Sequence, residues 1–351
     1  MDQLKELPIP LLLWYRENAR VLPWRSHPTP YRVWVSEIML QQTRVAAVLD
    51  YYRRFLEALP TVADLAAVPE DALMKLWQGL GYYSRARNLQ RAARQIMEEH
   101  GGIFPSTYEE IRALSGVGDY TAGAISSIAF GLPVPAVDGN VLRVAARVTG
   151  DEGDIAAPAT KKRVTAALAE IIPLDAPGDF NQAMMELGAT VCGPNTAPRC
   201  DDCPVSGLCL GRQRGTAETL PVKKAKKERR VEEKTVLLLM RDRKIALRKR
   251  PKTGLLAGLW EFPNVEGALD ETAAGAAVEA MGLSVIDWQS RLTAKHIFTH
   301  VEWRMTGYAL TVRGDGPAEL EWVDAAGLAA RSVPSAFARY YEEAKRELEM
   351  K

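Results

Sequence analysis

The segment that decides the fold is residues 114–140, LSGVGDYTAGAISSIAFGLPVPAVDGN. It opens on a Gly-x-Gly turn, Gly116-Val117-Gly118, where glycine permits positive φ and lets a ligand approach the backbone closely. The residues from about 119 to 129 predict an amphipathic helix. Its N-terminus offers unpaired N–H groups and partial positive charge, which suit a phosphate. The segment therefore predicts a helix-turn-helix element whose turn can hold a phosphate.

A single acidic residue, Asp138, follows this helix after a Pro-rich crossing. It directly precedes the next helical pattern, Val141-Leu142-Arg143-Val144, and so occupies an N-cap position. Backbone N–H groups at an N-cap stabilise the charged form of a carboxylate. We therefore expect Asp138 to remain ionised at neutral pH.

A second candidate acid, Glu37, lies in VSEIMLQQTRV at residues 35–45. On a helix its neighbours at one turn are Val33, Trp34 and Leu40. A carboxylic acid packed among such groups loses solvation, so its pKa should rise. A raised pKa is what a general acid working near neutral pH requires.

The four cysteines of the chain are confined to residues 192–209. Their spacing is Cys192-x7-Cys200-x2-Cys203-x5-Cys209. Clustering of this kind in a chain without a recognisable signal peptide indicates a metal site rather than a disulfide framework. The spacing alone is compatible with zinc or with an iron–sulfur cluster.

These motifs together resemble the endonuclease III superfamily of DNA glycosylases. LSGVGDYTAGA is similar to the family's helix-hairpin-helix pattern L-P-G-V-G-x-x-T-A, and VDGNVLRV to the segment that carries its catalytic Asp. The sequence SEIMLQQT resembles the MutY branch, the adenine glycosylases. The resemblance covers nearly the whole chain, strongly to about residue 210 and more weakly after about residue 235.

The resemblance implies that Glu37 protonates adenine and that Asp138 stabilises the oxocarbenium ion or adds to it covalently. Tyr120 and Asn140 would orient Asp138 and a water molecule. Endonuclease III-like enzymes for oxidised pyrimidines, the closest alternative, form a Schiff base through a lysine. Tyr120 stands at that position, which favours a monofunctional adenine glycosylase.

The resemblance also assigns residues to DNA. Arg20, Trp24, Arg25 and Gln182 would border the adenine pocket, although the family often has Glu in place of Gln182. Gln42 would enter the space left by the displaced base, with Leu40 and Thr43 close to the DNA, and Tyr82 would act as a wedge between bases. Arg85, Arg87 and the hairpin around Gly116 and Gly118 would hold the DNA backbone. Aromatic and basic residues together are typical of such surfaces.

For the cysteines the resemblance implies a [4Fe–4S] cluster held by Cys192, Cys200, Cys203 and Cys209. The family spacing is x6-x2-x5, and this chain has one extra residue in the first gap, GPNTAPR. A loop that contains proline can absorb one residue. We expect the cluster to stabilise the structure and to help position the DNA rather than to perform redox chemistry.

The C-terminal third changes character. Strand patterns at TVLLLM, IALRKR and AKHIFTHVEWRMTGYALTV surround a helix at ETAAGAAVEAM. This mixed α/β pattern resembles the MutT-like (Nudix) domain, but its helix lacks the R-E-x-x-E-E carboxylates that hold magnesium. We therefore expect a recognition module rather than a nucleotide hydrolase. The family's Phe-Ser-His turn, which touches 8-oxoguanine, is here Phe298-Thr299-His300.

The 351 residues therefore predict a multi-domain protein. We expect an all-α glycosylase domain at 1–212, with its hairpin at about 109–130 and its cysteine loop at 192–209. A charged linker at 213–234 and a Nudix-like α/β domain at 235–351 follow. A net charge of +1 gives no support for DNA binding by itself, so that role depends on local clustering.

The expected substrate is adenine opposite 8-oxoguanine, or guanine, in duplex DNA. A catalytically silent DNA-binding protein is the alternative from another class, and the presence of both Glu37 and Asp138 argues against it. We expect a monomer. No apolar run reaches the ~20 residues of a membrane span, so we expect a cytoplasmic protein associated with the nucleoid.

Overall fold

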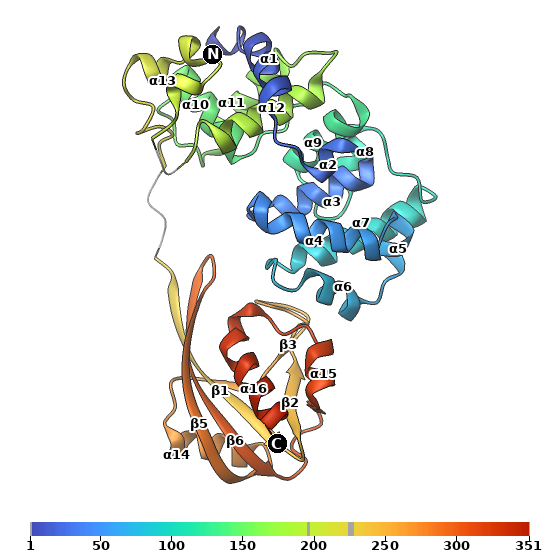
Figure 1. The fold of residues 1–351 in the computed structure, drawn as a ribbon, viewed down its shortest axis with the longest axis vertical. Coiled ribbons are helices and arrows are strands. Elements are labelled where there is room, and N and C mark those ends of the chain that lie inside the picture. Colours follow the sequence, from blue (N-terminus) through green and yellow to red (C-terminus); the bar gives the residue numbers. More distant parts are fainter. Residues whose placement is uncertain (1, 195–196, 224–227, 351) are drawn as a thin grey trace. The chain divides into compact units, whose positions relative to one another are not determined.

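The computed structural model describes residues 2–194, 197–223 and 228–350. The chain forms two compact units, drawn in Figure 1. The first contains residues 1–67 and 87–225, and the second contains residues 68–86 and 226–351. No helix among the described residues is both long and apolar enough to cross a membrane.

The first unit is helical throughout its described residues. Its helices are α1 (Pro8–Asn18), α2 (Pro23–Ser26), α3 (Pro30–Leu40), α4 (Val45–Ala58), α5 (Val62–Ala67), most of α7 (Ser84–Glu99), α8 (Tyr108–Ala113), α9 (Asp119–Phe130), α10 (Gly139–Thr149), α11 (Pro158–Ala169), α12 (Pro177–Thr190) and α13 (Leu210–Gln213).

The hairpin predicted from the sequence is formed by α8 and α9. Thr107 caps α8: its hydroxyl accepts from the Glu110 backbone N–H and donates to the Glu110 carboxylate at 2.7 Å. Gly116 has φ of +76°, and a Cβ there would lie 2.5 Å from the Asn88 side chain, so the turn requires glycine. Gly118 has φ of −95° and is the N-cap of α9, so only the first of the two glycines uses a left-handed backbone.

The break between α3 and α4 lies at residues 41–44. Thr29 caps α3 and Pro30 occupies its first turn, which suits proline because no intrahelical N–H partner is needed there. The helix ends at Leu40 because its C-cap Gln41 leaves the helical region with ψ of 111°, and Gln42 follows with a left-handed backbone, φ +58°. Helices α3 and α4 are thus joined by a tight turn at residues 41–44.

The core of the first unit is built where α1, α10, α11 and α12 meet. Leu7, Leu11, Ala145, Phe180 and Leu187 are fully buried in it. Cys192 and Cys203 pack against the edge of this cluster. The cysteine loop is thereby attached to the same core that carries α10 and α12.

The second unit contains a seven-stranded mixed sheet among its described residues. Its strands are β1 (Arg230–Arg241), β2 (Lys244–Lys249), β3 (Trp260–Glu261), β4 (Asn264–Glu266), β5 (Ser284–Ile297), β6 (Val301–Arg313) and β7 (Leu320–Val323). The order is β3-β2-β1-β6-β5, with β4 paired to β1 and β7 to β2. Only the β1–β6 pair is parallel in this sheet as described.

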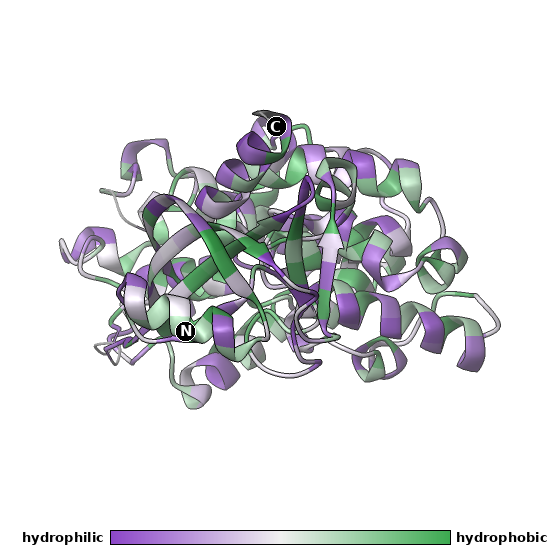
Figure 2. Ribbon diagram, turned by 90° about the horizontal axis from the view of Figure 1, so that it is seen from below, coloured by the Kyte–Doolittle hydropathy of each residue, from purple (hydrophilic) through white to green (hydrophobic). Residues whose placement is uncertain are grey.

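The two faces of this sheet are covered by different helices. Along β1, Leu237 and Leu239 pack toward α14 (Glu271–Ala280), whereas Val236 and Leu238 pack toward α16 (Ala338–Met350). This alternation follows from the two-residue period of a strand. Figure 2 shows hydrophobic residues along the strands and hydrophilic residues on many helices. Two further helices are α6 (Glu70–Trp77) and α15 (Ala325–Ala330).

The charged segment predicted as a linker is partly regular structure. Helix α13 runs to Gln213, and β1 begins at Arg230 and contains Glu232 and Lys234. The charges of Arg230–Lys234 therefore belong to a strand, whose pairing with β6 supplies backbone hydrogen bonds that the charge pattern does not reveal. Residues 224–227 of the predicted linker lie outside the described residues.

Candidate active site

A cavity of about 1040 Å³ opens in the helical unit. Its wall is drawn from α2, α3, the turn after α3, the hairpin, the start of α10 and α12. This volume is at the upper end of the range for ligand pockets, and it can accommodate a nucleotide. Most of the residues predicted to act on adenine border it: Arg20, Trp24, Arg25, Glu37, Leu40, Gln42, Thr43, Gly116, Gly118, Tyr120, Asp138, Asn140 and Gln182.

Glu37 lies on the buried face of α3 and is only 5% exposed. Burial raises the pKa of Glu37 to about 7. A hydrogen bond from Tyr120 and the charge of Arg25 oppose this rise, whereas the charge of Asp138 adds to it. The rise expected from the helical neighbours is confirmed, and it leaves Glu37 able to exchange a proton near neutral pH.

Asp138 is the N-cap of α10. Its Oδ1 accepts from the Val141 backbone N–H at 2.8 Å, and its Oδ2 accepts from Asn140 Nδ2 at 2.7 Å. Burial nevertheless raises the pKa of Asp138 above its ordinary value, against these hydrogen bonds. The carboxyl groups of Glu37 and Asp138 thus differ in their hydrogen bonding, because Asp138 accepts from two donors, which favour its charged form.

Tyr120 contacts Glu37 rather than Asp138. Its hydroxyl donates to Glu37 Oε2 at 2.5 Å and lies 3.2 Å from the Met185 sulfur. Tyr120 thus bonds to Glu37, whereas Asn140 donates to Asp138, and a role of Tyr120 in orienting Asp138 and the water remains a prediction. Met185 lines the cavity and also packs against the core cluster, in which Met184 is buried.

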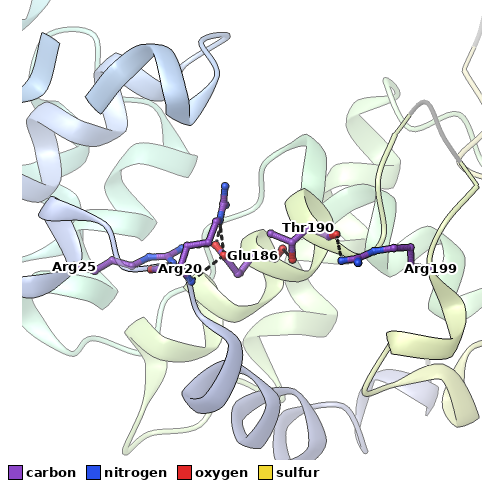
Figure 3. A network of polar contacts seen from close by, with 5 residues as sticks. All are labelled: Arg20, Arg25, Glu186, Thr190 and Arg199. Carbon is purple, nitrogen blue, oxygen red and sulfur yellow. Dashed lines mark hydrogen bonds and ion pairs between the residues drawn. The ribbon is translucent and has the colours of Figure 1, made fainter. Parts of the chain in front are cut away.

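One wall of the cavity is held by a buried ion cluster, shown in Figure 3. The Glu186 carboxylate accepts from Arg20 Nε at 2.6 Å, from Arg20 Nη2 at 2.9 Å and from Arg25 Nη2 at 2.7 Å. Arg25 also donates to the Arg20 carbonyl at 3.0 Å. Glu186 is a site residue that sequence reasoning missed, and its acidic position one turn after Gln182 on α12 was the available signal.

The two residues predicted to enter the base stack, Gln42 and Tyr82, share a left-handed backbone conformation. Gln42 has φ of +58° and Tyr82 has φ of +47°, and both side chains are exposed. Non-glycine residues rarely adopt this conformation, and such residues cluster at functional sites. Tyr82 belongs to the second compact unit, where its hydroxyl lies 3.0 Å from Thr299 Oγ1.

Arg85 is buried in this structure. It is 7% exposed, and its guanidinium donates to the carbonyls of Leu80 at 3.0 Å and Gly81 at 3.1 Å. Burial lowers the pKa of Arg85 to about 10. These donors close the turn that presents Tyr82, and a contact of Arg85 with the DNA backbone remains a prediction. Arg87 is half-buried, and its role remains a prediction.

The four cysteines border one pocket beside α10. Burial, with smaller contributions from the charges of the other three cysteines, raises the pKa of Cys203 to about 12, so the four sulfurs lie within electrostatic range of Cys203. Among the described residues no three His, Cys, Asp or Glu form a group that could hold a single metal ion. A set of four sulfurs around a shared pocket fits a larger cluster, since cysteine thiolates are its usual ligands. Residues 195–196 of the long first gap lie outside the described part.

A buried arginine connects the cysteine loop with the catalytic end of α10. Arg143 donates to the Cys192 carbonyl and to Asn140 Oδ1, each at 2.8 Å, and to the Gly188 carbonyl at 2.8 Å. Arg147, one turn later, donates to Cys192 Sγ at 3.1 Å. A Cβ at Gly188 would lie 2.7 Å from the Asn140 Cβ, so α10 and α12 approach closely here.

In the second unit, the three residues predicted to meet 8-oxoguanine form the β5–β6 turn. The Phe298 ring packs on Trp303 with 4.9 Å between ring centroids, while Thr299 and His300 are exposed. Helix α14 carries only Glu271 and Glu279 as acids among its ten residues. It therefore lacks the carboxylate set of a magnesium-dependent Nudix hydrolase.

Comparisons with known proteins agree with this division. The model of the HhH-GPD superfamily base excision DNA repair proteins matches residues 35–174, and that of the NUDIX domain matches residues 235–343. A thermostable thymine-DNA glycosylase structure superimposes with a TM-score of 0.56 and 28% identity, covering 61% of this chain and 98% of that one. An endonuclease III–DNA covalent intermediate gives a TM-score of 0.52 and 26% identity, covering 61% and 97%.

Two curated relatives are similar over most of the chain. The adenine DNA glycosylase of Homo sapiens is 37% identical over 88% of this chain and 67% of its own length. That of Rattus norvegicus is 36% identical over 96% of this chain and 78% of its own length. The helix-hairpin-helix core with two acids in one cavity, followed by a NUDIX domain, agrees with this similarity. The chain belongs to the adenine DNA glycosylase family and is a DNA N-glycosylase of base excision repair.

Proposed function

We propose that this enzyme is a monofunctional glycosylase that releases adenine opposite 8-oxoguanine in duplex DNA. The observation that carries the proposal is the pair Glu37 and Asp138 in one cavity. Glu37 is poised to titrate near pH 7, and Asp138 receives two hydrogen bonds that favour its charged form. A monofunctional reaction follows from Tyr120, whose hydroxyl is bonded to Glu37 where a lyase would need an amine.

The target nucleotide first leaves the base stack, which costs a few kcal/mol and least for a mispair. Glu37 then donates its proton to adenine, at N7 by family analogy, and the C1′–N9 bond breaks with its electron pair moving to the base. The sugar becomes oxocarbenium-like, and the Asp138 carboxylate stabilises it or adds to C1′. Water adds at C1′, and its released proton restores the enzyme's carboxylic acid, leaving adenine and an abasic site.

Binding is assigned to residues that border the same cavity. Arg20, Trp24, Arg25 and Gln182 would surround adenine, and Leu40, Gln42, Thr43 and the hairpin glycines would meet the DNA. Their common lining of one cavity supports this. In the second unit, Tyr82 would enter the stack and the Phe298-Thr299-His300 turn would contact 8-oxoguanine. The hydroxyl of Thr299 is a suitable hydrogen-bond partner for the oxidised base.

Four cysteines would hold a [4Fe–4S] cluster, namely Cys192, Cys200, Cys203 and Cys209. When bound, the cluster would supply a rigid, charged loop rather than a step in base release. The shared pocket of the four sulfurs and the Arg147 donor to Cys192 support this. We further propose that the enzyme acts as a monomer on nucleoid DNA, with residues 1–212 as the glycosylase domain and the Nudix-like module from about residue 235.

The test is single-turnover base release from three duplexes, containing adenine opposite 8-oxoguanine, adenine opposite guanine, and thymine glycol. The proposal expects the fastest release from the first, with strand breakage only after alkali. Breakage of the thymine glycol strand without alkali would instead assign the enzyme to the endonuclease III branch. Equal rates for 8-oxoguanine and guanine would remove the lesion preference while leaving the adenine reaction.

A further inference from the structure

Glu186 is a buried carboxylate in the cavity wall to which the reaction above gives no role. Its side chain has no exposed surface, and it receives three side-chain hydrogen bonds from two arginines. It also accepts from the Arg20 backbone N–H at 3.2 Å. Burial would raise the pKa of Glu186, but the bonds from Arg20 and Arg25 outweigh it, so the pKa lies below its ordinary value. Glu186 is therefore charged at neutral pH.

One of the two arginines that Glu186 binds, Arg25, is close enough to Glu37 to affect its charge state. Arg25 lies on α2, borders the same cavity as Glu37, and lowers the pKa of Glu37 through its charge. The Nε–H of Arg25 is buried and has no acceptor in the described structure. A guanidinium with a spare buried donor would form a charge-assisted bond with any carboxylate it could reach.

The other groups around Glu37 do not hold Arg25. Tyr120 on α9 donates to Glu37, and Asp138 at the start of α10 is bonded to Asn140 and Val141. On the other side, the Arg25 guanidinium lies over the Tyr15 ring of α1, 5.5 Å from its centroid. Glu186 from α12 is the charged partner of Arg25 among the described ion pairs.

We propose that Glu186 is a positioning residue for the glycosylase reaction: it binds Arg20 and Arg25 and so prevents Arg25 from pairing with Glu37. Glu37 must carry a proton to act as an acid. A guanidinium paired with it would stabilise its charged form and remove that proton at neutral pH. This inference rests on the proposed role of Glu37.

The test is the pH dependence of single-turnover adenine release by the full-length enzyme, between about pH 5 and about pH 9. In the wild type the rate falls as pH rises through the pKa of Glu37, and this fall is the high-pH limb of the pH–rate profile. In Glu186→Gln, Arg25 turns to Glu37, and this limb moves to lower pH by roughly one unit, which is about a tenfold loss above pH 7. Arg25→Gln removes the cation and moves the limb to higher pH.

The double variant E186Q/R25Q separates positioning from a structural role. With the intruding guanidinium absent, its limb returns to the wild-type position or above. A matched control is Glu261→Gln in the other unit, where a buried glutamate also binds two arginines, Arg248 at 2.9 Å and Arg250. It removes a comparable buried ion cluster, and its pH limb stays at the wild-type position.

Three outcomes would overturn the inference. They are an E186Q limb at the wild-type position, an E186Q rate that falls equally at every pH, and an R25Q limb that does not move upward. The last holds even if E186Q does not fold, which circular dichroism would show. A wild-type enzyme without a limb near pH 7 would remove Glu37 from its role, and the inference with it.

Discussion

Arg143 Nη2 donates to Asn140 Oδ1 at 2.8 Å, and Asn140 in turn donates to the Asp138 carboxylate at 2.7 Å. Because Arg143 also holds the Cys192 carbonyl, the orientation of Asn140 depends on the cysteine loop. The amide of Asn140 is fixed on both sides: its oxygen accepts from the arginine, and its nitrogen is thereby left to face Asp138. A single buried side chain thus joins the start of α10 to the loop after α12.

Replacing Arg143 tests this connection. Arg143→Gln loses bonds to four acceptors in a buried setting, and we expect the free energy of unfolding to fall by about 2 to 4 kcal/mol. Adenine release should fall as well, because Asn140 is free to turn away from Asp138. Urea titration and single-turnover rates measure the two effects. Arg163→Gln, which removes an exposed ion pair to Asp151, should cost about 1 kcal/mol or less. Equal effects of the two substitutions would contradict the connection.

Removing the acid of Glu37 should stop the reaction without preventing DNA binding. Glu37→Gln keeps the shape of the side chain but cannot donate a carboxyl proton. General acid catalysis contributes roughly a hundredfold or more, so adenine release should fall at least that far. Gel-shift titration of the mispaired duplex should give an affinity close to that of the wild type. Glu57→Gln, which breaks an exposed ion pair with Arg53, serves as the control. Base release that survives Glu37→Gln would assign the role of the acid to another residue.

The Tyr120 hydroxyl should tune the pH range of the enzyme. It donates to Glu37 and so favours the charged form, which opposes the rise in the pKa of Glu37 caused by burial. Tyr120→Phe removes this donor, and the pKa should rise further. The fall in rate at high pH should then begin on the order of half a unit to one unit higher. Tyr108→Phe on α8 is the control, and a shift to lower pH in Y120F would contradict the assigned direction of the bond.

The nature of the metal site is decided by absorbance and metal analysis. With the proposed cluster, the purified protein is brown, contains iron, and keeps its visible thiolate-to-iron band in a mild chelator. Cys203→Ser should lose iron and band together, whereas Ser206→Ala in the same loop should keep both. A colourless wild-type protein that contains zinc would overturn the cluster assignment.

Thr299 tests lesion recognition. Thr299→Ala removes the hydroxyl proposed to meet 8-oxoguanine, and one neutral hydrogen bond is worth about 1 kcal/mol. The ratio of adenine release opposite 8-oxoguanine to that opposite guanine should therefore fall about fivefold. Thr299→Ser keeps the hydroxyl and should keep the ratio. Should T299A and T299S give the same ratio, the hydroxyl has no part in the preference.

The sequence by itself determined the local structure and the two acids. The hairpin, the N-cap at Asp138 and the strands of the second unit follow from capping residues, glycine and periodic apolar positions, which act over a few residues. The rise in the pKa of Glu37 was also foreseeable, because its neighbours one turn away on α3 are apolar.

Only the tertiary structure decided which partners the polar side chains take. Glu186 and Arg20 are 166 residues apart, and no local pattern pairs them. Arg85 closes its own turn, and Tyr120 meets Glu37 rather than Asp138. Each outcome depends on which helices pack together, since the burial and charge that set a pKa or occupy a donor come from side chains distant in sequence.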